Sequence, residues 1–156
     1  MRIAVLLHNI RSTHNVGSIF RTAEAAGVEK IYLTGYTPAP TDRFGRAQKD
    51  IAKTALGAEK MLSWERRSSP ATVISELRAH GWNVVGVEQD KRAVDYRTFS
   101  AGRKPKKPTL LIFGNEVKGI PFALRKQCDM LVEIPMHGKK ESLNVSVAAG
   151  IILFST

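Results

Sequence analysis

Short apolar runs recur along this chain and alternate with segments that have the 3.6-residue period of helices. The runs are continuous and rich in Val, Ile and Leu, which is typical of strands that are covered on both faces. The alternation predicts an α/β architecture in which a mainly parallel sheet is flanked by helices. The expected strands lie at about residues 2–8, 29–34, 82–88, 109–114 and 130–135, with a weaker one near 61–65.

Four segments carry the helical pattern. In the clearest, residues 15–26, the apolar side chains recur at i, i+3, i+4 and i+7, Asn15 is placed to cap the start, and Gly27 is placed to end it. The last segment is apolar on most sides, which predicts a buried helix. The other expected helices span about 71–80, 121–127 and 144 onward.

Two stretches interrupt the alternation. Residues 35–57 begin with prolines and carry several cations, and residues 100–108 place four cations beside two prolines, which is typical of a solvated loop. Neither stretch has the composition of a domain linker. We therefore expect one domain over residues 1–156, with no appended RNA-binding domain.

The charge of the chain points to a polyanionic partner. Its 24 Lys and Arg against 14 Asp and Glu give a formal net charge of +10, which favours nucleic acid, although a surface tuned for solubility is the alternative. A single cysteine, Cys128, excludes an internal disulfide and is expected to be a buried, inert thiol. No run reaches the length of a membrane span, so a cytoplasmic protein is expected.

Three corners of the predicted fold have the same layout, in which an apolar strand is followed by small or polar residues and then by a helix. They are residues 15–21, residues 113–119, and the triplet Ser142-Leu143-Asn144 after the last strand. Such corners leave backbone donors and acceptors free at the carboxyl ends of strands, where α/β proteins hold ligands. Three of them predict one composite site.

Two charged residues in these corners are candidates for chemistry. Arg21 lies off the apolar stripe of its helix and one turn after Gly17, a glycine that would let a ligand approach the backbone. This arrangement suits the clamping of a phosphate or a ribose. The alternative is a surface arginine paired with Glu24. Glu116 follows the most apolar strand, where its carboxylate could pair with Arg21 or accept backbone N–H bonds. For Asn15 the alternative to substrate contact is helix capping.

The chain lacks the motifs of several other classes of protein. No G-x-G-x-x-G follows a strand and no G-x-x-x-x-G-K-[ST] is present, which disfavours dinucleotide and nucleoside-triphosphate enzymes. The four histidines and one cysteine have no zinc spacing, so no metal is expected. Ser142 is not in a G-x-S-x-G elbow. The aromatic residues do not alternate with the basic ones, which disfavours a single-strand binding module.

Taken together, the three corners resemble the signature motifs of the SpoU-type RNA ribose 2′-O-methyltransferases, the TrmH-like branch of the SPOUT class. The resemblance is carried by N-x-G-x-x-x-R in 15–21, LLIFGNEVKGIP in 110–121 and IPMHGKKESLNVSVAAGIILF in 134–154. It implies a deep trefoil knot at the C-terminal end of the α/β fold, an exception to the unknotted rule. It also implies that S-adenosylmethionine is held by Val87, Gly114, Ile134, Met136, Ser142 and Leu143.

The resemblance further implies how the reaction is organised. The active site would be shared in a homodimer, with Arg21 of one chain facing the cofactor of the other. Arg21 would act either as the base or as an electrostatic clamp, and the physical argument favours the clamp because a guanidinium stays protonated. Asn15, Glu116, Ser142 and Asn144 would position Arg21, the ribose and the cofactor. The expected substrate is a ribose 2′-hydroxyl of tRNA, or of rRNA.

Because no appended domain is expected, RNA contacts should come from cations of the domain itself. A cluster at 103–107 is a weaker candidate than those in or near the motif loops. The alternative function is a catalytically inactive RNA-binding or assembly factor on the same fold, against which the complete set of motif residues argues. The candidate RNA contacts are Arg11, Arg43, Arg46, Lys49, Lys53 and Lys118.

Overall fold

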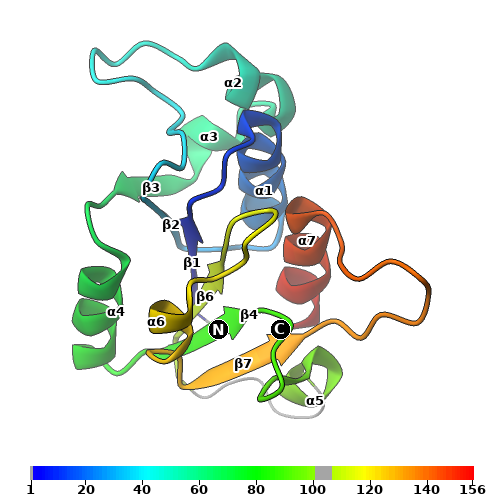
Figure 1. Ribbon diagram of the computed structural model, residues 1–156. Helices are drawn as coiled ribbons and strands as arrows, with labels where there is room; N and C mark the ends of the chain where they lie inside the picture. The colour runs from blue at the N-terminus through cyan, green and yellow to red at the C-terminus, as the bar shows by residue number, and fades with distance from the viewer. Residues whose placement is uncertain (1, 101–106) are drawn as a thin grey trace.

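A computed structural model describes residues 2–100 and 107–156 and places a parallel sheet at the centre of the molecule (Figure 1). All strand pairs in the described ranges are parallel, in the order β3-β2-β1-β6-β4-β7-β5. This confirms the predicted mainly parallel sheet, including the weaker strand, which is β3. The short β5 was not predicted. The strands are β1 Ile3–His8, β2 Lys30–Thr34, β3 Ser63–Arg66, β4 Asn83–Val87, β5 Val94–Asp95, β6 Thr109–Phe113 and β7 Met130–Glu133.

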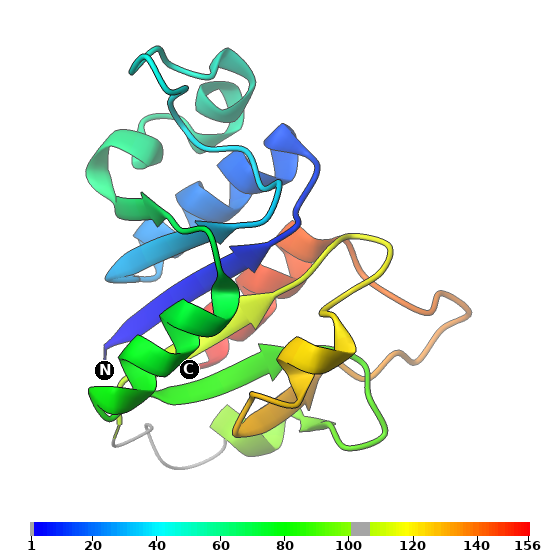
Figure 2. The same cartoon turned by 60° about the vertical axis from the view of Figure 1, so that its left-hand side comes forward.

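Helices cover both faces of this sheet (Figure 2). Helices α1, α5 and α7 lie on one face and α4 and α6 on the other, while α2 packs on the outer side of α1. Helices α2, α3 and α5 were not predicted. The helices are α1 Thr13–Ala25, α2 Lys49–Ala55, α3 Ala58–Met61, α4 Pro70–Ala79, α5 Tyr96–Ser100, α6 Phe122–Arg125 and α7 Val145–Ser155.

The two faces of the sheet form two apolar cores, which explains the continuous apolar runs. Successive side chains of a strand point to opposite faces. In β1, Val5 and Leu7 therefore join the core beneath α1 and α7, whereas Ala4 and Leu6 join the core beneath α4 and α6. The side chains of Val5, Leu6 and Leu7 are fully buried, and each contributes about 1.5–3 kcal/mol of hydrophobic stabilisation.

The start of α1 differs from the prediction in one respect. Ser12, not Asn15, caps the helix, because its hydroxyl accepts a hydrogen bond from the backbone N–H of Asn15 at 3.1 Å. Asn15 lies in the first turn and is only 8% exposed. Its side chain is therefore available for contacts with other parts of the chain.

Gly17 serves the packing of α1 against α2. A Cβ atom at this position would lie 2.0 Å from the Thr54 Oγ1 atom and 2.4 Å from the carbonyl oxygen of Ile51. Only glycine allows this approach of the two helices. The expectation that Gly17 opens the backbone to a ligand is wrong, because α2, which was not predicted, occupies that space.

Helix α7 follows β7, which lies between β4 and β5 in the sheet, and packs against α1 and α5. Ala149, Ile152 and Leu153 are buried, but Val147 and Phe154 are 50% and 66% exposed. The predicted burial of the whole helix is therefore wrong for a single chain. The knot that the resemblance implies for this segment stays a prediction.

Cys128 matches its prediction as an inert thiol, although it is partly rather than fully buried. Its Sγ atom lies 3.5 Å from the carbonyl oxygen of Leu124, and burial raises the pKa of the thiol to about 11. The thiol is therefore protonated at neutral pH. No helix in the described ranges is long and apolar enough to cross a bilayer.

The raised pKa of Cys128 predicts slow alkylation. A thiol with a pKa of about 11 in place of 9.0 carries about a hundredfold less thiolate near pH 8. We expect native protein to react with iodoacetamide at least about a hundredfold more slowly than protein unfolded in urea, measured by mass spectrometry. Equal rates would contradict the burial of this thiol.

Candidate active site

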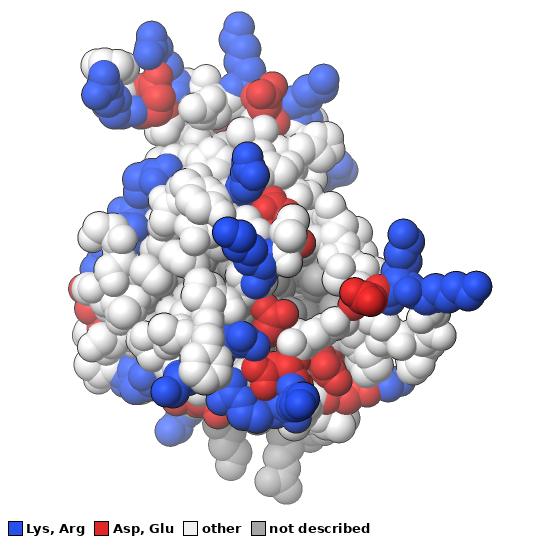
Figure 3. Space-filling model, viewed as in Figure 1, with Lys and Arg blue, Asp and Glu red and all other residues white. Residues whose placement is uncertain are grey.

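A pocket of about 350 Å³ opens at the carboxyl ends of β4, β6 and β7. It is visible in Figure 3 as a hollow near the middle of the molecule. Its volume is in the range of small-molecule and cofactor sites. The structure brings together in its lining all the residues that the resemblance assigns to the cofactor, namely Val87, Gly114, Ile134, Met136, Ser142 and Leu143.

A chain of polar side chains joins the three sequence corners beside this pocket. The Asn15 amide donates to Glu116 Oε1 at 3.3 Å, and the Asn144 amide donates to Asn15 Oδ1 at 3.1 Å. Asn144 also caps α7, because its Oδ1 accepts the backbone N–H of Ser146 at 2.8 Å. The corners after β1, β6 and β7 therefore meet in one hydrogen-bonded unit.

Glu116 is the centre of this unit. Its carboxylate accepts the backbone N–H groups of Arg11 at 3.1 Å and Ser12 at 3.0 Å. Burial raises the pKa of this carboxyl, but the backbone hydrogen bonds from Ser12 and Arg11 outweigh burial, so the pKa lies below its ordinary value. Glu116 is thus an ionised residue that fixes a loop. It accepts hydrogen bonds from this loop and is not paired with Arg21.

The pocket is acidic although the chain is basic. Figure 3 shows acidic side chains gathered around the hollow. Four carboxylates line it against a single lysine, Lys118. Such a lining favours a ligand that carries positive charge on its apolar body. The carboxylates belong to Glu88, Glu116, Glu133 and Glu141.

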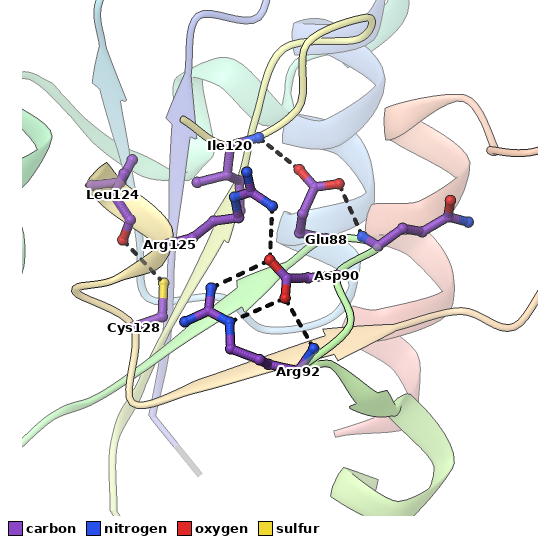
Figure 4. Close-up of polar contacts among 8 residues, drawn as sticks. Glu88, Asp90, Arg92, Ile120, Leu124, Arg125 and Cys128 are labelled. Atoms are coloured by element: carbon purple, nitrogen blue, oxygen red, sulfur yellow. Dashed lines mark hydrogen bonds and ion pairs between the residues drawn. The ribbon is translucent and has the colours of Figure 1, made fainter. Parts of the chain in front are cut away.

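Glu88 is a pocket residue that the sequence interpretation missed. It follows β4, and its Oε2 atom accepts the backbone N–H of Ile120 at 2.7 Å (Figure 4). The neighbouring Gly119 has a φ of +67°, and a Cβ there would lie 2.1 Å from the same carboxylate oxygen. Glu88 therefore holds the loop after β6 closely. In the sequence, Glu88 is a carboxylate at the end of an apolar strand. The same pattern had identified Glu116 and could have identified Glu88 as well.

The loop after β4 is braced by a second carboxylate (Figure 4). Asp90 accepts hydrogen bonds from Arg92 at 3.1 Å and from Arg125 of α6 at 2.7 Å. The side chain and backbone of Arg92 lower the pKa of Asp90 to about 2, and Arg125 adds to this. The carboxylate therefore stays ionised at physiological pH, and its ion pair with Arg125 links the loop after β4 to α6.

Arg21 lies in a separate surface hollow, outside the pocket of its own chain. This hollow is formed by α1, α2 and the end of α7, where Arg21 lies near Lys53 and Phe154. Arg21 is exposed and forms no ion pair, with Glu24 or any other residue, in the described part of the chain. Neither pairing considered from the sequence, with Glu24 or with Glu116, is therefore formed within a single chain.

The candidate RNA contacts fall into two groups. Lys118 lines the pocket, and Arg11 lies beside it, where its backbone N–H donates a hydrogen bond to Glu116. Arg43, Arg46, Lys49 and Lys53 lie on the segment that leads into α2 and on α2 itself. Figure 3 shows cations along this upper end of the molecule. Of the weaker cluster at 103–107, all but Lys107 lie outside the described residues.

The sequence profile of the SpoU rRNA Methylase family matches residues 2–154. The chain belongs to this family. Solved structures of similar proteins have the same fold as this chain. An AdoMet-bound rRNA methyltransferase from Sinorhizobium meliloti superposes on it with a TM-score of 0.86 and is 32% identical in sequence. The match covers 99% of this chain and 55% of that one. The parallel sheet with helices on both faces is thus the SpoU methyltransferase fold.

Curated SpoU relatives include enzymes of both tRNA and rRNA. A 23S rRNA (guanosine-2′-O-)-methyltransferase of Ralstonia nicotianae is 34% identical over 97% of this chain and 57% of its own length. A tRNA (guanosine(18)-2′-O)-methyltransferase of Aquifex aeolicus is 32% identical over 97% of this chain and 67% of its own length. The chain thus spans little more than half the length of most of the relatives it matches.

Proposed function

We propose that this protein transfers a methyl group from S-adenosylmethionine to a ribose 2′-hydroxyl of RNA, with tRNA preferred over rRNA. One observation carries the proposal: the Asn15–Glu116–Asn144 unit joins three corners beside a pocket of about 350 Å³. The relatives in Ralstonia nicotianae and Aquifex aeolicus are both guanosine 2′-O-methyltransferases, which supports the same reaction. For action on cellular tRNA or rRNA, we propose a cytoplasmic location.

The pocket residues fit the proposed cofactor. When bound, S-adenosylmethionine supplies an activated methyl group on a positively charged sulfur. The excess of carboxylates over lysine in the lining suits that charge. Val87, Gly114, Ile134, Met136, Ser142 and Leu143 would hold the cofactor, and Glu88 would keep the loop after β6 in place for it.

The chain itself must orient and activate the ribose. A 2′-hydroxyl is a weak nucleophile at neutral pH, so it must be aligned with the methyl group and must lose its proton, to a substrate phosphate or to water, as its oxygen accepts that group. The negative charge that develops on the oxygen as the proton leaves needs stabilisation. Arg21 is suited to both tasks, because a guanidinium keeps its charge in proteins and can hold a phosphate with two donors. Asn15, Glu116, Ser142 and Asn144 would complete the positioning of the reactants.

The placement of Arg21 supports a homodimer with a shared active site. In one chain Arg21 lies in its own surface hollow, outside the pocket. That hollow adjoins exposed apolar side chains, Phe154 and Leu56, which are 66% and 65% exposed. Such a patch is typical of an interface. A second copy that covers it would bring Arg21 to the partner's pocket.

Methyl transfer tests the proposed function directly. We expect incubation with methyl-labelled S-adenosylmethionine and deproteinised cellular RNA to place label on ribose, detected as 2′-O-methylated nucleosides after digestion of the RNA. Label on a base would refute the ribose assignment. RNA binding without cofactor binding in calorimetry would instead identify an inactive RNA-binding factor.

A further inference from the structure

A tight loop at residues 41–47 presents a single aromatic side chain, Phe44, at the upper end of the molecule. Thr41 and Ala47 form an antiparallel bridge that closes the loop. Inside it, the backbone N–H of Gly45 donates to the carbonyl of Asp42 at 3.0 Å, and Gly45 has a φ of +77°. The chain therefore reverses direction at this point in a defined turn.

The turn is organised by the carboxylate of Asp42. Its Oδ1 atom accepts the backbone N–H groups of Phe44 at 2.8 Å and Arg46 at 3.0 Å, and its Oδ2 atom accepts the Arg46 guanidinium at 2.7 Å. The backbone hydrogen bond from Arg46 is the largest cause that lowers the pKa of Asp42. These contacts fix the backbone and leave the Phe44 ring directed outward.

Phe44 is 66% exposed and lies beside two arginines. The guanidinium carbon of Arg43 lies 4.8 Å from the ring centre, and that of Arg46 lies 5.0 Å from it. An exposed phenyl ring contributes nothing to the core, and the ordered turn does not fold it back onto the protein. The arrangement combines a solvent-exposed aromatic ring with two guanidinium groups that lie over it, which are the two elements of a nucleic-acid stacking platform.

The surroundings continue this positive surface. Lys49 and Lys53 of α2 follow the turn in sequence, and Figure 3 shows Lys and Arg side chains along the upper end of the molecule. Lys53 also lines the hollow that holds Arg21. A strand of RNA whose ribose reaches Arg21 would therefore meet cations that lead toward Phe44.

We propose that Phe44 stacks on an unpaired base of the RNA substrate while Arg43 and Arg46 contact the adjacent phosphates. The proposal rests on the proposed function and narrows its substrate class to RNA with an accessible loop or single strand. A base inside a duplex already stacks on its neighbours and offers no free face, whereas single-stranded bases stack readily on aromatic side chains.

The chain contains a matched control for this ring. Phe122 of α6 is 61% exposed and also lies between two cations, with Arg125 at 5.6 Å and Lys126 at 5.3 Å from its ring centre. Arg125 is paired with Asp90 at 2.7 Å, just as Arg46 is paired with Asp42 at 2.7 Å, so the two rings have matched charged surroundings. They differ in position, because Phe122 belongs to α6, which lies on the opposite face of the sheet from α1 and Arg21. Phe122 should take no part in RNA binding.

The test compares the variants Phe44→Ala, Phe44→Trp and Phe122→Ala. The probe is a fluorescein-labelled RNA single strand of about twelve nucleotides, a length that a basic groove with stacking residues can bind, beside an RNA duplex of equal length. We expect Phe44→Ala to weaken binding of the single strand about tenfold and binding of the duplex less than about twofold. Phe44→Trp should retain affinity, and Phe122→Ala should match the wild type.

Three outcomes would overturn the proposal: unchanged single-strand affinity in Phe44→Ala, equal losses for single strand and duplex, or an equal loss in Phe122→Ala. Circular dichroism of each variant checks that the fold is kept. Methyl transfer by the wild type, measured in parallel, keeps the two proposals separate. Transfer by the wild type with no effect of Phe44→Ala refutes the stacking site alone, and RNA binding without transfer refutes the proposed function alone.

Discussion

Replacing Arg21 with alanine should reduce methyl transfer by at least about a hundredfold, because the variant loses the group that stabilises charge on the ribose oxygen. Cofactor affinity should change less than about twofold, since Arg21 is proposed to contact the ribose and its phosphate and is not among the residues that line the cofactor pocket. Single-turnover transfer and calorimetry with S-adenosylmethionine measure the two effects. The variant should also fold normally, because Arg21 is exposed and forms no ion pair in the described ranges. Unchanged turnover would remove Arg21 from the mechanism.

Mixing two inactive variants provides the control for a shared site. Gly114→Ala should distort the pocket, since a Cβ there would lie 2.4 Å from the backbone of Gly119 and Ile120. The two variants, Arg21→Ala and Gly114→Ala, are mixed in equal parts, unfolded and refolded together. If the Arg21 of one chain serves the pocket of the other, half of the resulting dimers are mixed and each mixed dimer carries one intact site. About a quarter of wild-type activity should then return. If Arg21 acts within its own chain, no activity returns.

Replacing Glu116 with glutamine should lower both stability and activity. The neutral amide retains one oxygen, so it cannot accept all the hydrogen bonds that now come from Arg11, Ser12 and Asn15. We expect a loss of about 2 kcal/mol in the free energy of unfolding. Transfer should fall at least about tenfold, because the corner that carries Asn15 is released. Urea unfolding and transfer assays measure these effects.

The effect of Glu116 should also depend on pH. Its pKa is below the ordinary value in the folded protein, so it stabilises the fold at pH values above the unfolded-state pKa. That contribution is lost as the pH falls through the folded-state pKa. The stability difference between wild type and Glu116→Gln should therefore shrink below about pH 4. Glu24→Gln, which removes one carboxylate charge from α1, should not show this stability loss.

The strands and the positions of the site loops were predictable because both depend on local patterns. The runs that became β1 and β6 are buried on both faces, so all their residues except the terminal His8 and Thr109 are apolar and the strands are evident in the sequence. Polar residues directly after those strands marked the corners around Asn15 and Glu116. Parallel strands place such corners at one edge of the sheet, which is why their convergence could be foreseen.

The parts of the structure that could not be predicted from the sequence depend on tertiary packing. Helix α2 has only seven residues, and its position against α1 follows from the close contact at Gly17. Strand β5 has two residues and exists only through its pairing with β7. Phe44 gave no stacking signal, because it is a single aromatic residue and its arginines were read only as phosphate contacts. A local pattern does not contain such contacts.

The hydrogen bonds that join the corners have a consequence for how the protein reaches its working form. Asn144 and Asn15 are 129 positions apart, and Glu116 and Ser12 are 104 apart. Closing such long loops carries an entropy cost before the contacts compensate for it, which slows folding. The unit that joins the three corners therefore cannot form until the segment around Asn144 has been synthesised and has docked beside Asn15. If the protein methylates RNA as proposed, a partly synthesised chain has no complete site with which to do so.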